Sequence, residues 1–392
     1  MAGSTGSEQT QGTPLVEPGP ALSPERLTRY SRQLLLPGFG ESAQRRLAAA
    51  RVLVVGAGGL GSATVPYLAA AGVGTIGIVD EDAVELSNLH RQVAHALADV
   101  GREKTGSLAA AVAAIDPGTR VERHDLRLDS TNVMDILAGY DLVLDGSDNF
   151  ATRYLTSDAA AIASKPLVWG AIFRYAGQAS VSYAGHGPTY RDLFPVPPEP
   201  GEVLSCAAGG VLPSLCAAIG SIMVTETIKL ITGIGRPLIG RVISYDALSG
   251  SFREIPYRSI PDAPPVTELI DYEAFCGVAA RPEAAGNPAS IDVHELARRR
   301  RAGEPLQLVD VREPFEAAIA SIDGSEPIPL RLLPQSVGRL RRDVPIVVYC
   351  HHGPRAERAR DIMREHGLGE VAVLAGGIDA YAALIEPSMA RY

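Results

Sequence analysis

The sequence predicts a protein built from two α/β domains, and three observations support this prediction. First, strand-like runs such as RVLVVGAG, TIGIVD and DLVLDGSD alternate with alanine-rich helical runs, which is typical of a largely parallel sheet. Second, a loose stretch rich in Pro, Gly and Ala interrupts the chain after residue 262. Third, a shorter set of strand-like runs, LQLVDV, PIVVYC and VAVLAG, follows that stretch. We therefore expect a disordered tail (1–22), a first domain (23–262), a linker (263–290) and a second, smaller domain (291–392).

The composition argues against several classes of protein. A net charge of -9 gives no reason to expect general binding to nucleic acids or membranes. The one basic run, 298–301, precedes a glycine and is expected at a helix C-terminus, where cations are favoured. The four cysteines form no CxxC pair and suggest no disulfide framework. The first residues lack the regions of a signal peptide, and polar residues interrupt the apolar stretch 211–233. We therefore expect a buried helix there and a cytoplasmic protein.

The first strand–turn–helix pattern predicts a nucleotide site. Gly56, Gly58 and Gly61 lie between a strand and a helix, where glycines let phosphate oxygens approach backbone N–H groups. The next strand, TIGIVD, ends in Asp80, which is placed to accept hydrogen bonds from ribose hydroxyls. The default ligand of such a pattern is NAD or FAD, which would make the protein an oxidoreductase.

The residues that follow Asp80 favour ATP over NAD. They supply charged and amide side chains at or near strand ends: Asn88, Arg91, Gln92, Lys104, Asp148 and Asn149. Arginine and lysine neutralise a triphosphate and a carboxylate holds Mg²⁺, whereas hydride transfer needs neither. Taken singly, residues such as Arg91 and Lys104 are more often surface charges, but together, beside an acid at a strand end, they favour ATP chemistry. No GxxxxGK[ST] motif occurs, so ATP is not expected to bind as in P-loop proteins.

Five motifs in the first domain resemble the ThiF/MoeB family of ubiquitin-activating-like adenylyltransferases. They are RYSRQLLLPGFG, GAGGLGS, VDEDAVELSNLHRQ, GREKT and DGSDNFATRYL, in the family's order and spacing. The resemblance implies a Rossmann-like fold and the activation of a small ubiquitin-like sulfur-carrier protein that ends in Gly-Gly. The carrier's terminal carboxylate would attack the α-phosphorus of ATP and give an acyl-adenylate and pyrophosphate.

The same resemblance implies roles for individual residues. The expected nucleotide-binding residues are Gly56, Gly58, Gly59, Gly61, Asp80, Ser87, Asn88, Leu89, His90, Arg91, Gln92, Lys104, Asp148 and Asn149. Asp148 is also the expected Mg²⁺ ligand. Arg32 matches an arginine that relatives insert from the neighbouring subunit to stabilise charge on the transferring phosphate, so a homodimer is implied. Without the resemblance, Arg32 would be interpreted as a surface charge.

The first domain also departs from its relatives, many of which hold a structural zinc with two CxxC pairs. Thr189 and Asp192 stand where the first cysteines would be, and FREIPYRSIP lacks the second pair. Four soft ligands are needed to close such a site, so we expect no zinc and loops held by packing. Cys206 matches a loop cysteine of the family that takes part in carrier chemistry, although a buried small residue is the alternative. Cys216 is expected in the core, and Cys276 receives no role.

Near the C-terminus, a strand-like run delivers Cys350 into a Gly-Pro turn before an arginine-rich helix. A phosphatase of the CX5R type needs its arginine six positions after the cysteine, but this chain has Arg355 one residue earlier. The shorter loop favours a persulfide over a phosphate. Gly353 and Pro354 fit the N-cap and first position of a helix, whose positive end, together with Arg355, should stabilise a thiolate or persulfide.

The last hundred residues resemble a single rhodanese domain. Asp310 and Arg312 lie in its DVRE signature, Cys350 opens the active-site loop, and LAGGIDAY matches the closing turn. The usual GHIPGA is replaced by ASIDGS, which alters one edge. His351 and His352 are expected to shape the loop rather than to transfer protons.

Together the two resemblances imply a fused adenylyltransferase and sulfurtransferase. Cys350 would take sulfur from a cysteine desulfurase or thiosulfate, and its persulfide would displace AMP from the acyl-adenylate. Reduction through a disulfide between Cys206 and Cys350 would then release a carrier thiocarboxylate. Molybdopterin, thiamine, cysteine and secondary-metabolite pathways use similar carriers, so the pathway stays open. The alternatives are a non-catalytic scaffold that binds a ubiquitin-like carrier and an NAD-dependent oxidoreductase.

Overall fold

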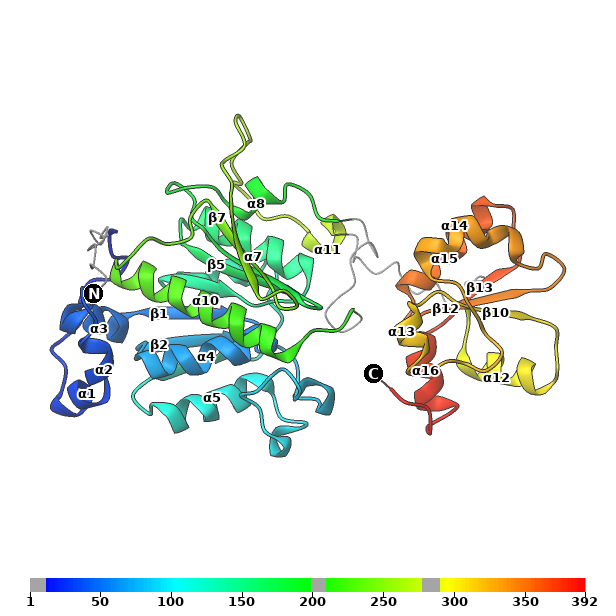
Figure 1. Ribbon diagram of the computed structural model, residues 1–392, viewed down its shortest axis with the longest axis horizontal. Helices are drawn as coiled ribbons and strands as arrows, with labels where there is room; N and C mark the ends of the chain where they lie inside the picture. Colours follow the sequence, from blue (N-terminus) through cyan, green and yellow to red (C-terminus); the bar gives the residue numbers. More distant parts are fainter. Residues whose placement is uncertain (1–11, 199–208, 277–289, 392) are drawn as a thin grey trace. The chain divides into compact units, whose positions relative to one another are not determined.

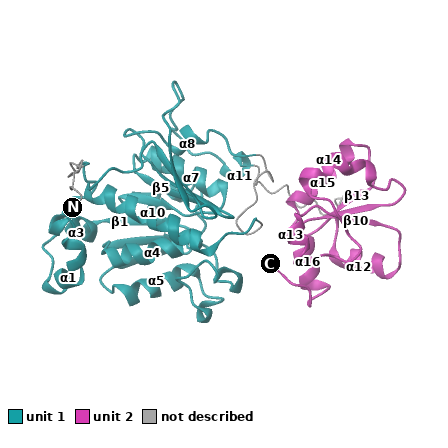
Figure 2. Ribbon diagram, viewed as in Figure 1, with its two compact units in different colours: residues 1–198, 204–278 teal, residues 199–203, 279–392 magenta. Residues whose placement is uncertain are grey.

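The computed structural model describes residues 12–198, 209–276 and 290–391, and the chain divides into two compact units (Figure 2). The first unit contains the described residues up to 276, and the second contains residues 290–391. Both units are α/β, so the predicted fold class is confirmed. The boundaries of the tail and the linker stay predictions.

The first unit is built on an eight-stranded sheet with the order β3-β2-β1-β4-β5-β6-β7-β8 (Figure 1). The strands are β1 (Arg51–Val55), β2 (Thr75–Val79), β3 (Arg120–His124), β4 (Leu142–Asp145), β5 (Leu167–Phe173), β6 (Ala176–Ser182), β7 (Arg241–Asp246) and β8 (Ser251–Pro256). The first five are parallel, and β6 to β8 pair antiparallel. The chain changes direction across the sheet between β1 and β4. Ligands of open α/β sheets bind at such a switch point, outside the carboxyl ends of the strands.

Helices cover both faces of this sheet, which explains why β1, β2 and β4 are almost continuously apolar. One face carries α3 (Gly40–Ala49), α4 (Gly59–Ala71), α5 (Lys104–Ile115) and α10 (Pro213–Thr232). The other carries α6 (Val133–Ala138), α7 (Phe150–Ile162), α8 (Tyr190–Leu193) and α11 (Tyr272–Phe275). The short helices α1 (Pro24–Arg29) and α2 (Ser31–Leu34) precede α3.

Helix α10 contains most of the long apolar stretch of the sequence. Within the described residues it is the one helix long and apolar enough to cross a membrane, with a mean hydropathy of 1.5. Its side chains Leu215, Ile219 and Met223 are fully buried against α4 and β5. The prediction of a buried helix in this stretch is therefore confirmed.

The beginning of the predicted linker docks on the first unit through a buried carboxylate. Asp158 of α7 accepts two hydrogen bonds from Arg191, of 3.0 and 2.7 Å, and one of 2.7 Å from the Tyr272 hydroxyl. The guanidinium of Arg191 also lies over the rings of Tyr154 and Phe275, 4.6 Å from each centroid. Burial, and then Asp158, raise the pKa of Tyr272, so its hydroxyl stays a donor. Helix α11 is thereby fixed to α7 and α8.

The loops that would carry zinc ligands in relatives are joined by Asp192. Its Oδ2 accepts hydrogen bonds from the backbone N–H and hydroxyl of Thr189, at 2.7 and 3.1 Å. Its Oδ1 accepts one of 2.8 Å from the N–H of Ile260, in the second loop. Tyr190 and Phe194 pack on Trp169 beneath this contact. Aromatic packing and one carboxylate therefore join these loops, and the carboxylate is a polar cross-link that the sequence did not reveal. The expected absence of zinc stays a prediction.

Replacement of Asp192 by alanine is expected to lower the free energy of unfolding by about 1–3 kcal/mol, because three donors lose their acceptor. A thermal melt of the full chain measures the change. Dialysis against a zinc chelator is expected to leave the melting temperature of the unsubstituted chain unchanged, since hydrogen bonds join the loops. A fall in melting temperature on chelation would contradict this account.

The second unit has a five-stranded parallel sheet with the order β11-β10-β12-β13-β9. The strands are β9 (Ser290–Ile291), β10 (Gln307–Asp310), β11 (Glu326–Pro327), β12 (Ile346–Tyr349) and β13 (Val371–Leu374). The helices are α12 (Val293–Arg301), α13 (Pro314–Ala317), α14 (Leu333–Ser336), α15 (Pro354–Glu365) and α16 (Gly377–Leu384). Helices α14 and α15 pack on one face, and α12 and α16 on the other. The basic run occupies the last turn of α12, as predicted.

Candidate functional sites

The glycine turn between β1 and α4 brings the ends of β1 and β4 into contact. Gly56 has φ of +91°, and a Cβ there would lie 3.2 Å from the backbone of Gly146, so only glycine fits. Helix α4 begins at Gly59 after the N-cap Gly58, and no side chain caps it. Its first N–H groups therefore lack the side-chain acceptor that most helices have, which suits an anion.

Gly59 is required by a contact that the sequence did not predict. A Cβ at this position would lie 2.8 Å from the Sγ of Cys216 on α10. The Cys216 side chain is buried, which confirms its predicted place in the core. The side chain of Cys216 therefore packs directly against the first residue of α4.

Gly59→Ala is expected to lower the rate of ATP-dependent pyrophosphate release about 100-fold, because a shift of the helix start by about 1 Å misplaces its N–H groups. The double variant Gly59→Ala/Cys216→Ala removes the clashing sulfur and should recover most of the rate. Cys216→Ala alone is the matched control for the loss of the thiol. A double variant as slow as Gly59→Ala would show that the sulfur is not the obstacle.

The acid at the end of β2 is held beside this turn. Asp80 accepts hydrogen bonds from the N–H groups of Ala57 (2.7 Å) and Asp82 (2.8 Å). The Nζ of Lys104 lies 4.0 Å from Asp80 and 2.7 Å from Asp82. Burial raises the pKa of Asp80, although Lys104 and the two N–H groups oppose this shift. The structure therefore brings Asp80, Lys104 and the glycine turn together, as the motifs imply.

His95 is a component of this region that sequence reasoning missed. Its Nε2 lies 3.2 Å from the Ala57 carbonyl in the glycine turn, and its Nδ1 lies 2.8 Å from the Ser107 hydroxyl on α5. Burial lowers the pKa of His95, so the imidazole is neutral and braces the turn. A single histidine between two loops leaves no spacing pattern that would have identified it.

The segment after Asp80 lies across the start of α4. It contains the short helix η1 (Leu86–Asn88) and η2 (Leu97–Asp99). The Arg91 side chain passes 3.8 Å from the Cβ position of Gly59, and the Nε2 of Gln92 lies 3.7 Å from that of Gly58. The other predicted residues of the segment are placed as follows: Asn88 is buried, Leu89 is partly buried, and Ser87 and His90 are exposed.

The end of β4 supplies the acidic side of the site. Asp148 is exposed between β4 and α7, three residues after the fully buried Asp145. Asn149 caps α7 with its Oδ1, which accepts a hydrogen bond of 2.8 Å from the N–H of Thr152. Its role at a nucleotide stays a prediction.

One buried polar atom near the glycine turn, the Oε1 of Gln92, has no hydrogen-bond partner among the described residues. The N–H of Ser147 lies 3.4 Å from the Cβ position of Gly56, which places Ser147 at the turn, and its side chain interacts with the buried Asp145. Buried polar atoms are normally paired, so the Gln92 oxygen fits a bound polar ligand or water. Together with Asp80, Lys104 and the uncapped helix, it fits a nucleotide.

Arg32, a predicted site residue, lies far from the glycine turn of its own chain. It lies on α2, next to Gln33, whose Nε2 bonds the carbonyl of Ala71 at 3.1 Å. Ala71 ends α4 and Gly59 begins it, so α4 places about 20 Å between them at 1.5 Å per residue. That separation exceeds the length of an arginine side chain. Cys206 lies outside the described residues.

In the second unit, Cys350 lies directly after β12 and is 1% exposed. Gly353 is the N-cap of α15 and Pro354 its first residue, as predicted, and the N–H of Gly353 points at the Cys350 Sγ at 3.1 Å. The backbone carbonyls of Cys350 and His351 accept hydrogen bonds from Ile378 (3.0 Å) and Asp379 (3.2 Å). The LAGGIDAY turn therefore holds the backbone of the cysteine loop in place through these two hydrogen bonds.

Arg355 is engaged by a carboxylate that the sequence did not identify. Its two terminal nitrogens donate to Glu316 of α13, at 2.7 and 2.8 Å, and both side chains are buried. Burial opposes ionisation of Glu316, but the bonds from Arg355 outweigh it and lower the pKa. The pair ties the loop to α13 and balances the charge of Arg355. The direct role of Arg355 on the persulfide stays a prediction.

The remaining signature residues form the interior of the same unit. Asp310 and Arg312 are a buried ion pair, and Arg312 also donates to the carbonyl of Ala320 at 2.8 Å. Burial, and then His352, lower the pKa of His351 to about 4. The neutral, buried His351 therefore fits the expected part in loop shape.

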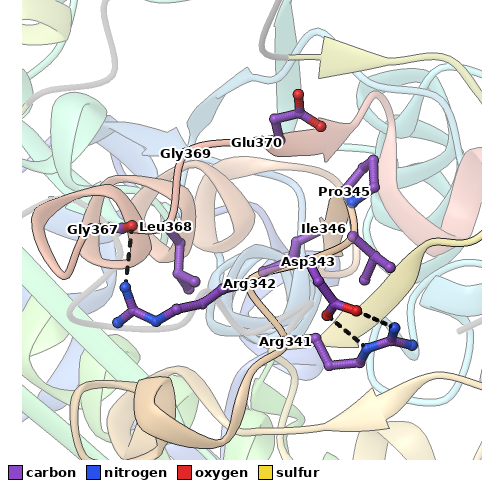
Figure 3. Close-up of a pocket in the computed structure, with 10 residues that line it drawn as sticks. Arg341, Arg342, Asp343, Pro345, Ile346, Gly367, Leu368, Gly369 and Glu370 are labelled. Atoms are coloured by element: carbon purple, nitrogen blue, oxygen red, sulfur yellow. Dashed lines mark hydrogen bonds and ion pairs between the residues drawn. The ribbon is translucent and has the colours of Figure 1, made fainter.

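Two cavities in the described part of the chain lie apart from these two centres. One of about 330 Å³ lies at the start of β12, at the end of the sheet opposite Cys350, between Arg342, Ile346 and Gly367 (Figure 3). The other, of about 210 Å³, lies in the first unit and is lined by Phe150, Trp169 and Tyr190. Phe150 follows Asp148 by two positions in the sequence. Among the described residues, no group of three or more His, Cys, Asp or Glu side chains is arranged to hold a metal.

Comparison with known proteins places each unit in a family. The ThiF family model matches residues 30–263, and the rhodanese-like domain model matches residues 292–384. A probable adenylyltransferase/sulfurtransferase MoeZ of Mycobacterium tuberculosis is 51% identical over 386 residues, which are 97% of this chain and 98% of that protein. A sulfur carrier protein adenylyltransferase of Thermus thermophilus is 50% identical over 65% of this chain and 98% of its own length.

Similarity extends to eukaryotes and to solved structures. The adenylyltransferase and sulfurtransferase MOCS3 of Drosophila yakuba is 38% identical over 98% of this chain and 90% of its own length. The crystal structure of E. coli MccB with ATP matches 61% of this chain and 74% of that chain, with a TM-score of 0.54 and 18% identity. At that identity the likeness shows the fold of the first unit alone.

Proposed function

This chain belongs to the ThiF family and continues into a rhodanese-like domain, and from this premise we propose that it adenylates a small sulfur-carrier protein and then transfers sulfur to it. One observation carries the proposal. A single chain holds both a glycine turn with an uncapped helix start, near Lys104 and Asp148, and a cysteine loop at the start of α15. The names of the full-length relatives favour adenylate chemistry over the NAD-dependent alternative.

In the first step, the C-terminal glycine carboxylate of the carrier attacks the α-phosphorus of ATP, and pyrophosphate leaves. The N–H groups of α4 and the side chains of Arg91 and Lys104 hold the phosphates, while Asp80 accepts from the ribose hydroxyls. Asp148 would hold Mg²⁺, which supplies charge neutralisation at the phosphates. A single exposed carboxylate suits this ion, because Mg²⁺ in such sites takes its other ligands from water and substrate.

In the second step, the Cys350 thiolate takes a sulfur atom from a cysteine desulfurase or from thiosulfate. The terminal sulfur of the Cys350 persulfide attacks the acyl-adenylate and AMP leaves, which gives an acyl disulfide. The Cys206 thiolate then attacks the Sγ of Cys350, and the carrier departs as its thiocarboxylate. An external dithiol returns the resulting disulfide to two thiols. This need for ATP and reduced thiols supports a cytoplasmic location.

We further propose a homodimer in which Arg32 of one chain completes the site of the other. The length of α4, about 20 Å at 1.5 Å per residue, supports this arrangement, because Arg32 lies at the end of that helix far from its own glycine turn. Beside Arg32, Leu35 and Leu36 are 74% and 54% exposed, which is typical of a surface that a partner covers.

The proposal is tested with purified protein, ATP, Mg²⁺, a sulfur donor and candidate carriers that end in Gly-Gly. We expect pyrophosphate release that depends on the carrier, and a carrier thiocarboxylate detected by its mass. The carrier that reacts identifies the pathway. If no carrier supports pyrophosphate release but one binds, the chain is a scaffold and the proposal is wrong.

A further inference from the structure

The segment Arg29–Gln33, at the junction of α1 and α2, is anchored by its side chains to the body of the first unit. Arg29 donates to the carbonyl of Ile115 at the end of α5, at 2.9 Å. Tyr30 and Gln33 contact the ends of α5 and α4. Arg32 is exposed, and its side chain has no hydrogen bond or ion pair within the described part of the chain. The segment is therefore fixed to the unit while the guanidinium of Arg32 is exposed at its surface.

Tyr30 is the first of the two principal anchors. Its side chain is 3% exposed, and its hydroxyl donates to Asp116 at the end of α5. Arg26 lies 3.7 Å from the same carboxylate. A Cβ on Gly72, just beyond α4, would lie 2.6 Å from the Cζ of Tyr30, so the ring packs directly on the end of α4. Burial, and then Asp116, raise the pKa of Tyr30 to about 12, so the phenol remains a donor.

Gln33 is the second anchor, and it contacts the same helix end. Its Nε2 donates to the Oε1 of Gln44 at 2.8 Å and to the carbonyl of Ala71 at 3.1 Å. The Nε2 of Gln44, which is fully buried, donates to that same carbonyl at 2.9 Å. The carbonyl belongs to the last residue of α4, where no further helical N–H can reach it. Two side-chain amides therefore satisfy the terminal carbonyl of the buried end of α4.

These contacts decide where Arg32 points. Helix α2 has four residues, too few to be stable by itself, so tertiary contacts must set its orientation. Adjacent residues of a helix differ by about 100° in direction, since 3.6 residues make a turn. With Gln33 turned inward onto Ala71, Arg32 is directed away from the unit.

We propose that Tyr30 and Gln33 are positioning residues that direct Arg32 into the nucleotide site of a second copy of this chain. This inference rests on the proposed function, because it requires the arginine to act across a dimer. It goes further by assigning the orientation of Arg32 to two side chains that contact neither the nucleotide nor the carrier.

The test uses mixed dimers in which only one site is complete. A chain with Arg32→Ala keeps its own nucleotide site, and a chain with Asp148→Asn keeps its arginine, so the mixed dimer has one working site. Gln33→Ala is then placed on either chain in turn. On the chain that donates the arginine, we expect about a tenfold lower kcat for pyrophosphate release, because the guanidinium is misdirected. On the other chain we expect a clearly smaller loss.

Two further measurements separate positioning from stability. The KM for ATP should change little when kcat falls, because the arginine acts on charge that develops in the transition state. Tyr30→Phe keeps the ring and removes the bonds of its hydroxyl to Asp116 and from Arg26, so it should show the same asymmetry with less effect on melting temperature. Equal losses from the two placements would overturn the positioning role. If the parent mixture without Gln33→Ala is inactive, the arginine does not act across the dimer, and both this inference and that part of the proposed function are wrong.

Discussion

Replacement of Cys350 by serine is expected to abolish formation of the carrier thiocarboxylate and to leave pyrophosphate release intact. A serine hydroxyl cannot store sulfur as a persulfide, and the adenylation residues lie in the other unit. Mass spectrometry of the carrier measures the first activity, and a pyrophosphate assay in the same reaction measures the second. We expect the thiocarboxylate to fall below detection, a loss of more than about 1,000-fold in keeping with the removal of a catalytic nucleophile.

The matched control is Cys276→Ala, which removes a second buried thiol from the core beside α7. It should leave both activities close to those of the unsubstituted chain. A Cys350→Ser chain that still forms thiocarboxylate at a comparable rate would show that sulfur reaches the adenylate without this loop. Loss of both activities would instead point to a dependence of adenylation on the second unit.

Arg32→Ala is expected to lower the kcat of pyrophosphate release about 1,000-fold, the lower end of the effect of an arginine supplied in trans to a transferring phosphate. The exposed position of Arg32 means that its removal should cost little stability. Arg253→Ala, at an exposed position of β8, is the control for the loss of one surface charge.

A mixture of two impaired variants regains activity only if Arg32 of one chain acts in the nucleotide site of the other. In an equal mixture of Arg32→Ala and Asp148→Asn chains, about half of the dimers are mixed and each holds one complete site, so about one quarter of the original activity should return. An Arg32→Ala chain with unchanged kcat would show that Arg32 is only a surface charge. If the Arg32→Ala chain is impaired and mixing with the Asp148→Asn chain restores no activity, Arg32 acts within its own protomer.

The local features of this chain could be predicted from its sequence because each is encoded by neighbouring residues. The glycine turn follows from the spacing of Gly56, Gly58 and Gly61 between a strand and a helix. The start of α15 follows from Gly353 and Pro354, which favour an N-cap and a first helical position. Alternation of strands and helices was sufficient for the fold class.

The contacts that tune the two centres could not be predicted, because they join residues far apart in the chain. Glu316 meets Arg355 across 39 positions, and the sulfur of Cys216 lies under Gly59. Neither contact produces a periodicity or a motif. The spacing of Arg355 from Cys350 was visible in the sequence, but the carboxylate that balances the charge of Arg355 was not.

The cross-link made by Asp192 has a chemical consequence for an enzyme that handles sulfane sulfur. A zinc clamp built from two CxxC pairs would place four more thiolates in the same molecule, and thiolates attack persulfides and disulfides. Here a carboxylate joins those loops, and the whole chain has four cysteines, of which Cys216 and Cys276 are buried away from solvent. In the proposed mechanism, fewer off-pathway nucleophiles would compete for the sulfur on Cys350. The loops also keep their cross-link when metal is scarce or the surroundings are oxidising.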